Sequence, residues 1–184
     1  MNMRRFALLF FSLLLVSCAK QDQSFCAGAT AKSYEPSFKI WCPTMNKGHF
    51  IPTIYGEGVS PPIMWEGLPL GTTHLHITVL DATCTYECDS CCQFHHWELE
   101  IPLHELPSSG PIIPGSIQAG ASKTIDAKYA QPNGAGKKSY FSFAPPPSQV
   151  HAYIYQATAY TMQGGKKRIL GRSQSDPLLF RVAQ

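Results

Sequence analysis

Apolar and polar residues alternate strictly in two stretches near the middle of the chain. The apolar positions are Leu75, Ile77 and Val79 in residues 74–80, and Trp97, Leu99 and Ile101 in residues 96–101. A period of two places every second side chain on one face, as in a strand that is buried on one side. We therefore expect two strands here. If they pair antiparallel across the intervening loop, Asp81 and His96 meet at the same edge of the sheet.

The rest of the pattern also predicts strands. Residues 38–42 are the first strand candidate, and residues 150–160 alternate again, so that His151, Tyr153 and Tyr155 share one face. A Gly-Gly turn and a short apolar run after residue 160 predict a hairpin followed by a final strand. Glycine and proline recur every few residues elsewhere, and apolar residues do not keep helical spacing. The sequence therefore predicts a mainly β protein.

The N-terminus has the features of an export signal. Arg4 and Arg5 precede an apolar run at residues 6–16, which is too short to span a bilayer as a helix and fits the core of a signal peptide. The letters LVSC that end at Cys18 are similar to a lipobox, in which the cysteine is acylated and becomes the mature N-terminus. The alternative is an ordinary secretory signal with an incidental cysteine. Ala19, in place of an aspartate, favours an outer membrane lipoprotein that faces the periplasm or the cell surface.

These features divide the chain into three segments. We expect a lipoprotein signal peptide at residues 1–17, a polar tether at 18–36 and one domain at 37–184. The formal net charge is only +3, and the basic clusters at 137–138 and 166–168 lie beside glycines. Such clusters are typical of solvated turns, so the sequence indicates no nucleic-acid partner.

Cysteines are concentrated in one short stretch. The chain has seven, and six remain if Cys18 is acylated: Cys26, Cys42, Cys84, Cys88, Cys91 and Cys92. Four of the six follow the spacing C-x3-C-x2-C-C, and thiolates at such spacing can also bind zinc or copper. An exported chain folds where thiols oxidise, however, so an even number of cysteines favours disulfides. We expect disulfides and no metal, with 15 possible pairings left open.

Several ordered motifs resemble one protein family. The string SPP-x-x-W-x-G-x-P-x-G-T begins at Ser60, an apolar strand ends in Asp81-Ala82, and a His-His-Trp sequence follows at residues 95–97. Later, APPPSQVHAY at residues 144–153 is similar to a Gly-Pro-x-Pro-Pro…His-Arg-Tyr segment. These motifs resemble the phosphatidylethanolamine-binding protein (PEBP) family, which includes the Raf kinase inhibitor protein, and its short bacterial branch in particular. The resemblance covers residues 38–160 and implies a PEBP-like antiparallel β-sandwich with few short helices.

The resemblance also implies a small-anion pocket. The ligand-binding positions it transfers to this chain are Asp81, His96, His151, Tyr153, Pro146 and Pro147. In such a pocket the imidazole N–H and phenol O–H groups donate to anionic oxygens, while a carboxylate orients one imidazole. The chain departs from the family motifs at Val79, Thr83 and Ala152. The alternation also places Glu98 and Glu100 on the face of His96, where their carboxylates would oppose an anion.

Three functions are compatible with these residues. The first is an exported, lipid-anchored binding protein for a small anion or phospholipid headgroup, which regulates or inhibits a partner protein as some relatives do. The second is an acid–base enzyme that uses the same pocket. The third is a cysteine-rich redox or metal-handling lipoprotein. No serine or cysteine lies in a recognisable nucleophile motif, so the sequence favours binding over catalysis and calls for no cofactor.

Overall fold

The computed structural model describes residues 37–46, 48–83, 94–106 and 115–182. By its internal contacts the chain divides into residues 1–30 and 31–184, and all described residues belong to the second unit. The elements, in chain order, are β1 (Lys39–Trp41), η3 (Thr53–Gly56), β2 (Ile63–Glu66), β3 (His74–Asp81), β4 (Phe94–Pro102), η4 (Leu103–Glu105), β5 (Ser116–Ile117), α1 (Ser122–Tyr129), β6 (His151–Gln163), β7 (Lys166–Gln174) and β8 (Leu178–Phe180).

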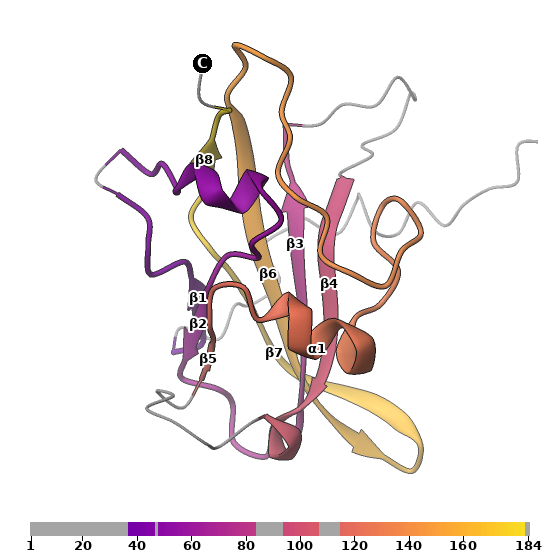
Figure 1. Ribbon diagram of the computed structural model, residues 1–184. Coiled ribbons are helices and arrows are strands. Elements are labelled where there is room, and N and C mark those ends of the chain that lie inside the picture. Colours follow the sequence, from indigo (N-terminus) through magenta and orange to yellow (C-terminus); the bar gives the residue numbers. More distant parts are fainter. Residues whose placement is uncertain (1–36, 47, 84–93, 107–114, 183–184) are drawn as a thin grey trace, which may run out of the picture. The chain divides into compact units, whose positions relative to one another are not determined.

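Two antiparallel sheets form this unit (Figure 1). The smaller sheet has the strand order β1-β2-β5, and the larger has the order β4-β3-β6-β7 with β8 also paired to β6. One hydrophobic core contains side chains of both sheets, among them Ile63 and Trp65 of the smaller and Leu75, Ile77 and Trp97 of the larger. The predicted fold class is confirmed: the described chain is mainly β, with α1 as its single α-helix.

The two alternating stretches pair as the sequence predicts. β3 lies between β4 and β6 and is antiparallel to both. Leu75 pairs with Ile101 and Ile77 with Leu99, so the apolar face of each strand contributes to the same core. Because β3 ends at Asp81 where β4 and β6 begin, the polar ends of three strands meet at one end of the larger sheet.

A β-bulge changes the face on which His96 lies. Val79 pairs with Trp97 but Leu80 pairs with His95, so His96 is an extra residue on β4. A bulge places two successive residues opposite one partner and redirects the first of them. His96 and Trp97 are accordingly both buried, with 5% and 0% of their surface exposed. The prediction that His96 shares a face with Glu98 and Glu100 is therefore wrong.

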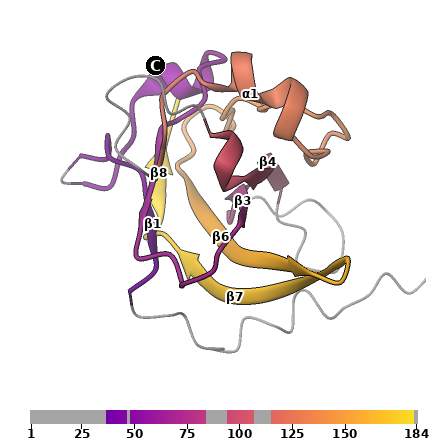
Figure 2. The same cartoon turned by 90° about the horizontal axis from the view of Figure 1, so that it is seen from below.

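The outer edge of β4 is covered by the segment at residues 130–141. Its backbone N–H groups donate to the carbonyl oxygens of β4: Gln131 to Glu98 at 2.8 Å, Gly134 to His95 at 2.8 Å and Phe141 to His96 at 2.7 Å. α1 lies beside the same strand (Figure 2), where Asp126 accepts a hydrogen bond from the Trp97 indole at 2.6 Å. The outer edge of β4 is therefore covered from His95 to Leu99.

The C-terminal part is a hairpin with a final strand, as the sequence predicts. β6 and β7 pair antiparallel around Gly164 and Gly165, which both have positive φ. β8 then returns to pair with the first residues of β6.

Among the described residues, no helix is long and apolar enough to cross a membrane.

Candidate functional site

A buried carboxylate and imidazole form the centre of the candidate site. Asp81 ends β3 and His151 begins β6, and Asp81 Oδ2 lies 2.6 Å from His151 Nδ1. The Thr83 N–H donates to the second carboxylate oxygen at 2.9 Å, so Asp81 is held on both sides. The other ring nitrogen of His151 lies 3.1 Å from Gln149 Oε1. Asp81 is an acceptor, so Nδ1–H of His151 donates to the carboxylate, and Gln149 Oε1 is placed to accept from Nε2 when Nε2 carries a proton.

His96 is held in an aromatic cage by a backbone hydrogen bond. Its Nδ1–H donates to the Phe141 carbonyl oxygen at 2.9 Å, which places the proton of the neutral ring on Nδ1 and the lone pair on Nε2. The centroids of Phe94, Phe143 and Tyr153 lie 4.8, 5.2 and 5.2 Å from that of His96. Burial lowers the pKa of His96, and the carbonyl of Phe141 only partly offsets this effect.

The four polar residues predicted for the pocket come together in the structure. Asp81 and His151 are hydrogen-bonded, and Asp81 pairs with Tyr153 across β3 and β6. The Tyr153 ring lies 6.5 Å from the His151 ring and 5.2 Å from the His96 ring, centroid to centroid. Two imidazoles, a carboxylate and a phenol are therefore grouped at the end of the larger sheet where β3 ends. Whether they bind a ligand stays a prediction.

The two prolines predicted to bind a ligand shape a turn beside the site. Pro146 and Pro147 are exposed and belong to the turn before β6. The Gln149 N–H donates to the Pro146 carbonyl oxygen at 3.1 Å, and Ser148 has a positive φ of 66°. This turn brings the Gln149 side chain to His151. The prolines shape the turn, and Gln149 is the residue of the turn that contacts the site.

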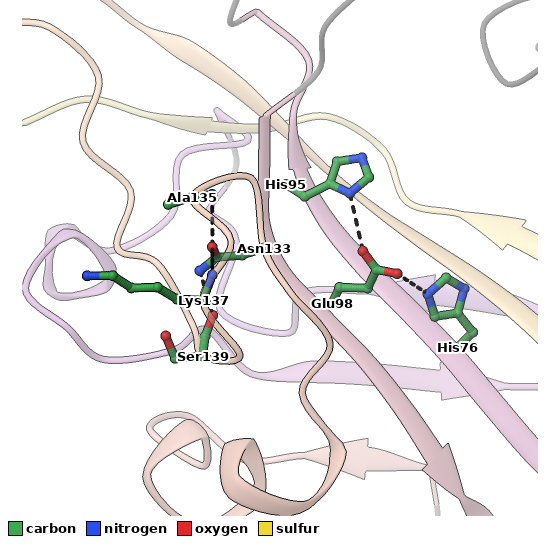
Figure 3. A network of polar contacts seen from close by, with 7 residues as sticks. All are labelled: His76, His95, Glu98, Asn133, Ala135, Lys137 and Ser139. Atoms are coloured by element: carbon green, nitrogen blue, oxygen red, sulfur yellow. Dashed lines mark hydrogen bonds and ion pairs between the residues drawn. The ribbon is translucent and has the colours of Figure 1, made fainter. Parts of the chain in front are cut away.

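Sequence reasoning missed the residues that support the site from the segment beside β4. Asn133 is buried, and its Oδ1 accepts from the N–H groups of Ala135 and Lys137 at 2.9 and 3.0 Å. Its amide donates to the Ser139 carbonyl oxygen at 2.9 Å, so one side chain organises the loop shown in Figure 3. The Pro-Asn-Gly sequence at residues 132–134 is a recognisable turn signal, but nothing local indicates that this turn packs against β4.

Glu98 forms a separate cluster with two histidines. Glu98 Oε1 lies 2.9 Å from His76 Nε2, and Oε2 lies 3.4 Å from His95 Nδ1 (Figure 3). These two contacts lower the pKa of Glu98 to about 2. Within the described residues, no group of histidine, cysteine, aspartate and glutamate side chains is arranged to hold a metal ion. Since Glu98 faces His76 and His95, its charge is directed away from His96.

Cys42 is the only predicted disulfide residue within the described ranges. It is buried, and its Sγ lies 3.3 Å from Thr44 Oγ1. It also lines a surface cleft of about 670 Å³ between β1 and the segment at residues 173–178. None of the four polar residues of the candidate site lines this cleft. The lipidation candidate, Cys18, and the other disulfide candidates lie outside the described residues: Cys26, Cys84, Cys88, Cys91 and Cys92.

Comparison with known sequences identifies relatives. The family model described as phosphatidylethanolamine-binding protein matches residues 41–176, which is well over half of the chain. Among curated proteins, the UPF0098 protein YbhB of Escherichia coli (strain K12) is 24% identical over 108 residues. This match covers 59% of the present chain and 63% of YbhB, so the chain spans less than two thirds of that relative's length.

Comparison with solved structures supports the fold. E. coli YbcL, described as a new member of the mammalian PEBP family, matches with a TM-score of 0.56 and 15% identity over 80% of this chain and 99% of YbcL. The putative PEBP homologue CT736 of Chlamydia trachomatis matches with a TM-score of 0.56 and 18% identity over 79% of this chain and 97% of that protein. At these identities the likeness shows a shared fold.

Proposed function

Because the chain belongs to the phosphatidylethanolamine-binding protein family, we propose that it is a binding protein that holds a small anion beside Asp81, His96, His151 and Tyr153. The ligand is a phosphate-sized anion, either free or as the headgroup of a larger molecule. The protein acts by binding, and the bound state regulates a partner protein.

The contact between Asp81 and His151 is the observation that carries this proposal. At 2.6 Å the carboxylate fixes the orientation of the imidazole, and a protonated imidazole held in this way attracts an anion. Asp81 and His151 are nearly buried, with 5% and 9% of their side chains exposed, so this charge is little screened by water. Glu98, whose charge would oppose an anion at His96, is directed toward His76 and His95.

The N-terminal sequence supports a location outside the cytoplasm. Acylation at Cys18 would anchor the chain in the outer membrane, with residues 18–36 as the tether and residues 37–184 as the binding domain. The partner protein would then lie in the periplasm or at the cell surface. A cytosolic kinase, the target of some family members, would be out of reach.

Calorimetric titration with inorganic phosphate and with phosphoethanolamine tests the anion site. His151→Ala removes the imidazole whose Nε2 would donate to the anion in place of Gln149, so we expect it to weaken binding by about tenfold or more, in line with the ~1.5–3 kcal/mol of a hydrogen bond to a charged group. Asp81→Asn should weaken binding in the same direction because the imidazole loses its orienting charge. Phosphoethanolamine binding without phosphate binding would identify the headgroup as the source of the anion.

Glu98→Gln is the matched control, since it removes a charge from β4, the strand that carries His96, without touching the pocket. We expect this variant to bind phosphate as the unchanged protein does. Equal affinities for the unchanged protein and His151→Ala would contradict the proposal, as would a Glu98→Gln effect as large as that of His151→Ala.

A further inference from the structure

The hairpin of β6 and β7 extends beyond the rest of the larger sheet. β6 pairs with β3 only as far as Tyr160, which faces His74 at the beginning of β3. From Thr161 to Arg168 the hairpin is a two-stranded ribbon around the Gly-Gly turn. Figures 1 and 2 show this ribbon, in yellow, passing the end of β3. We call residues 160–169 the hairpin tip. A two-stranded ribbon alone has no core in which to bury apolar side chains.

Two large apolar side chains are nevertheless exposed on this tip. Met162 and Ile169 have 45% and 47% of their surface exposed. Met162 pairs with Lys167 and Tyr160 with Ile169, so the register places Met162 and Ile169 on the same face of the ribbon. Apolar side chains that cluster at an exposed tip indicate a surface that contacts something other than water.

A third apolar side chain lies at the base of the tip. Leu70 is fully exposed in the turn before β3. The Thr73 N–H donates to the Tyr160 carbonyl oxygen at 3.1 Å, and the Thr73 hydroxyl donates to the Thr161 hydroxyl at 3.3 Å. These bonds hold the turn that carries Leu70 beside the hairpin, so Leu70, Met162 and Ile169 lie at the same end of the sheet.

All charged side chains of the hairpin tip are cations. Residues 160–169 contain Lys166, Lys167 and Arg168 but no aspartate or glutamate. Lys167 forms an ion pair with Glu100 of β4 and lies over the Tyr160 ring. Lys166 and Arg168 are exposed and project from the opposite face of the ribbon to Met162. The tip therefore combines aliphatic side chains with cations on a narrow, projecting element.

We propose that the hairpin tip docks on the surface of an anionic phospholipid bilayer. Met162, Ile169 and Leu70 reach the boundary between headgroups and acyl chains, while Lys166 and Arg168 lie among the anionic headgroups. Long basic side chains adapt to such a boundary because their stems are apolar and their ends are charged. A protein partner is less favoured because a two-stranded ribbon offers little area for a stable interface. Nucleic acid is less favoured because Tyr160, the aromatic residue of the tip, is buried.

Docking through the tip sets the orientation of the anion site. β3 runs from His74 beside the tip to Asp81 at the site, and eight residues of strand span about 23 Å. The site therefore lies at the far end of the sheet from the docked bilayer. The anion would be taken from solution on that side, and not from the membrane on which the tip rests. The docking of the tip does not rest on the proposed function; only this consequence for the anion does.

Vesicle co-sedimentation of the full chain tests the proposal. Cys18→Ser is included in every variant so that acylation is absent throughout, and vesicles contain phosphatidylcholine alone or mixed with phosphatidylglycerol. The tip variant carries Lys166→Glu and Arg168→Glu. The matched control carries Lys137→Glu and Lys138→Glu, which reverse the other exposed basic pair. Each cation near an anionic surface contributes about fivefold, so we expect the tip variant to lose at least about tenfold in partition onto phosphatidylglycerol vesicles while the control loses far less.

A tryptophan probe locates the contact independently of the leader sequence. Ile169→Trp should shift its emission to shorter wavelength on these vesicles and be quenched by lipids with brominated acyl chains. Ile54→Trp is the control, because Ile54 is equally exposed and lies in η3, the segment that packs near β8 and Phe143. Equal losses in the tip and control charge variants would overturn the proposal. So would equal binding to both lipid compositions, an unquenched probe at position 169, or tip-dependent self-association without vesicle binding.

Discussion

At the scale of single residues, the protonation of His96 connects the fold to ligand binding. Burial lowers its pKa below the ordinary value of 6.5, so the ring is neutral over a wider pH range than an exposed histidine. In the neutral ring Nδ1–H is bonded to Phe141, and Nε2 is an acceptor. His96 can donate to an anion through Nε2 only after it gains a second proton.

Anion affinity should therefore depend on pH through His96. As pH rises through the lowered pKa, the free protein loses the proton that the anion-bound state requires, so affinity should weaken by up to about tenfold per pH unit. Because the pKa is lowered, this weakening should begin below pH 6.5. Calorimetry with phosphate over a pH series measures it. His96→Gln should flatten this part of the profile, and an unchanged profile in that variant would contradict the role of His96.

The lowered pKa of His96 also makes the free energy of unfolding depend on pH, and the direction of this effect follows from the direction of the shift. In the unfolded chain the His96 ring takes up a proton near pH 6.5, whereas in the folded protein it does so only at lower pH. The unfolded state therefore binds more protons in this interval, and His96 lowers the free energy of unfolding as pH falls below 6.5. Glu98 acts at lower pH, where the stabilisation it receives from His76 and His95 is lost between pH 4.5 and about 2.

At the scale of elements, the bulge in β4 and the segment beside it place His96 in the site. The bulge directs the ring inward, and Phe141 of the neighbouring segment accepts its hydrogen bond. Gly134 of that segment lies so close to Phe94 that an added Cβ would be 2.7 Å from its ring. Phe94 in turn packs against His96. The loop that Asn133 organises is thus linked to the site by direct contacts.

Asn133→Ala should therefore reduce both stability and anion affinity. It removes three hydrogen bonds of a buried side chain, which we expect to cost about 2 kcal/mol or more in the free energy of unfolding. Denaturant unfolding and calorimetry measure the two effects. Asn46→Ala is the matched control, because Asn46 Oδ1 also accepts two backbone N–H groups but in an exposed loop elsewhere. Loss of anion affinity in Asn46→Ala, or its retention in Asn133→Ala, would show that the loop does not act on the site.

The alternation of apolar and polar residues predicts the two faces of a strand correctly where the strand is regular. From Trp97 to Ile101 the apolar and polar faces are as the sequence indicates, and the pairing of β3 with β4 is confirmed. At His96 the prediction is wrong because a bulge interrupts the period of two, and no residue at that position identifies it in advance. This error assigned Glu98 a repulsive effect on an anion at His96, whereas the structure directs its carboxylate toward His76 and His95.

At the scale of the whole molecule, the export of the protein and the oxidation of its cysteines to disulfides remain predictions. We expect the exported protein to contain disulfides among its six remaining cysteines. Titration of free thiols under denaturing conditions, before and after reduction, counts them. Reduction should lower the free energy of unfolding, since each bridge in a small exported domain contributes typically ~2–5 kcal/mol. A fully reduced exported protein that carries zinc or copper in a fixed ratio would instead favour the metal-handling alternative.

The sequence by itself determined the mainly β class, the approximate positions of the strands and the four polar residues that the structure brings together. These features are local or depend on strand ends, so a period of two, turn residues and family motifs are enough to indicate them. Only the tertiary structure decided the face of His96 and the covering of the edge of β4 by residues 130–141. Each of these depends on contacts between segments far apart in the chain or on an irregular register, for which the local pattern carries no signal.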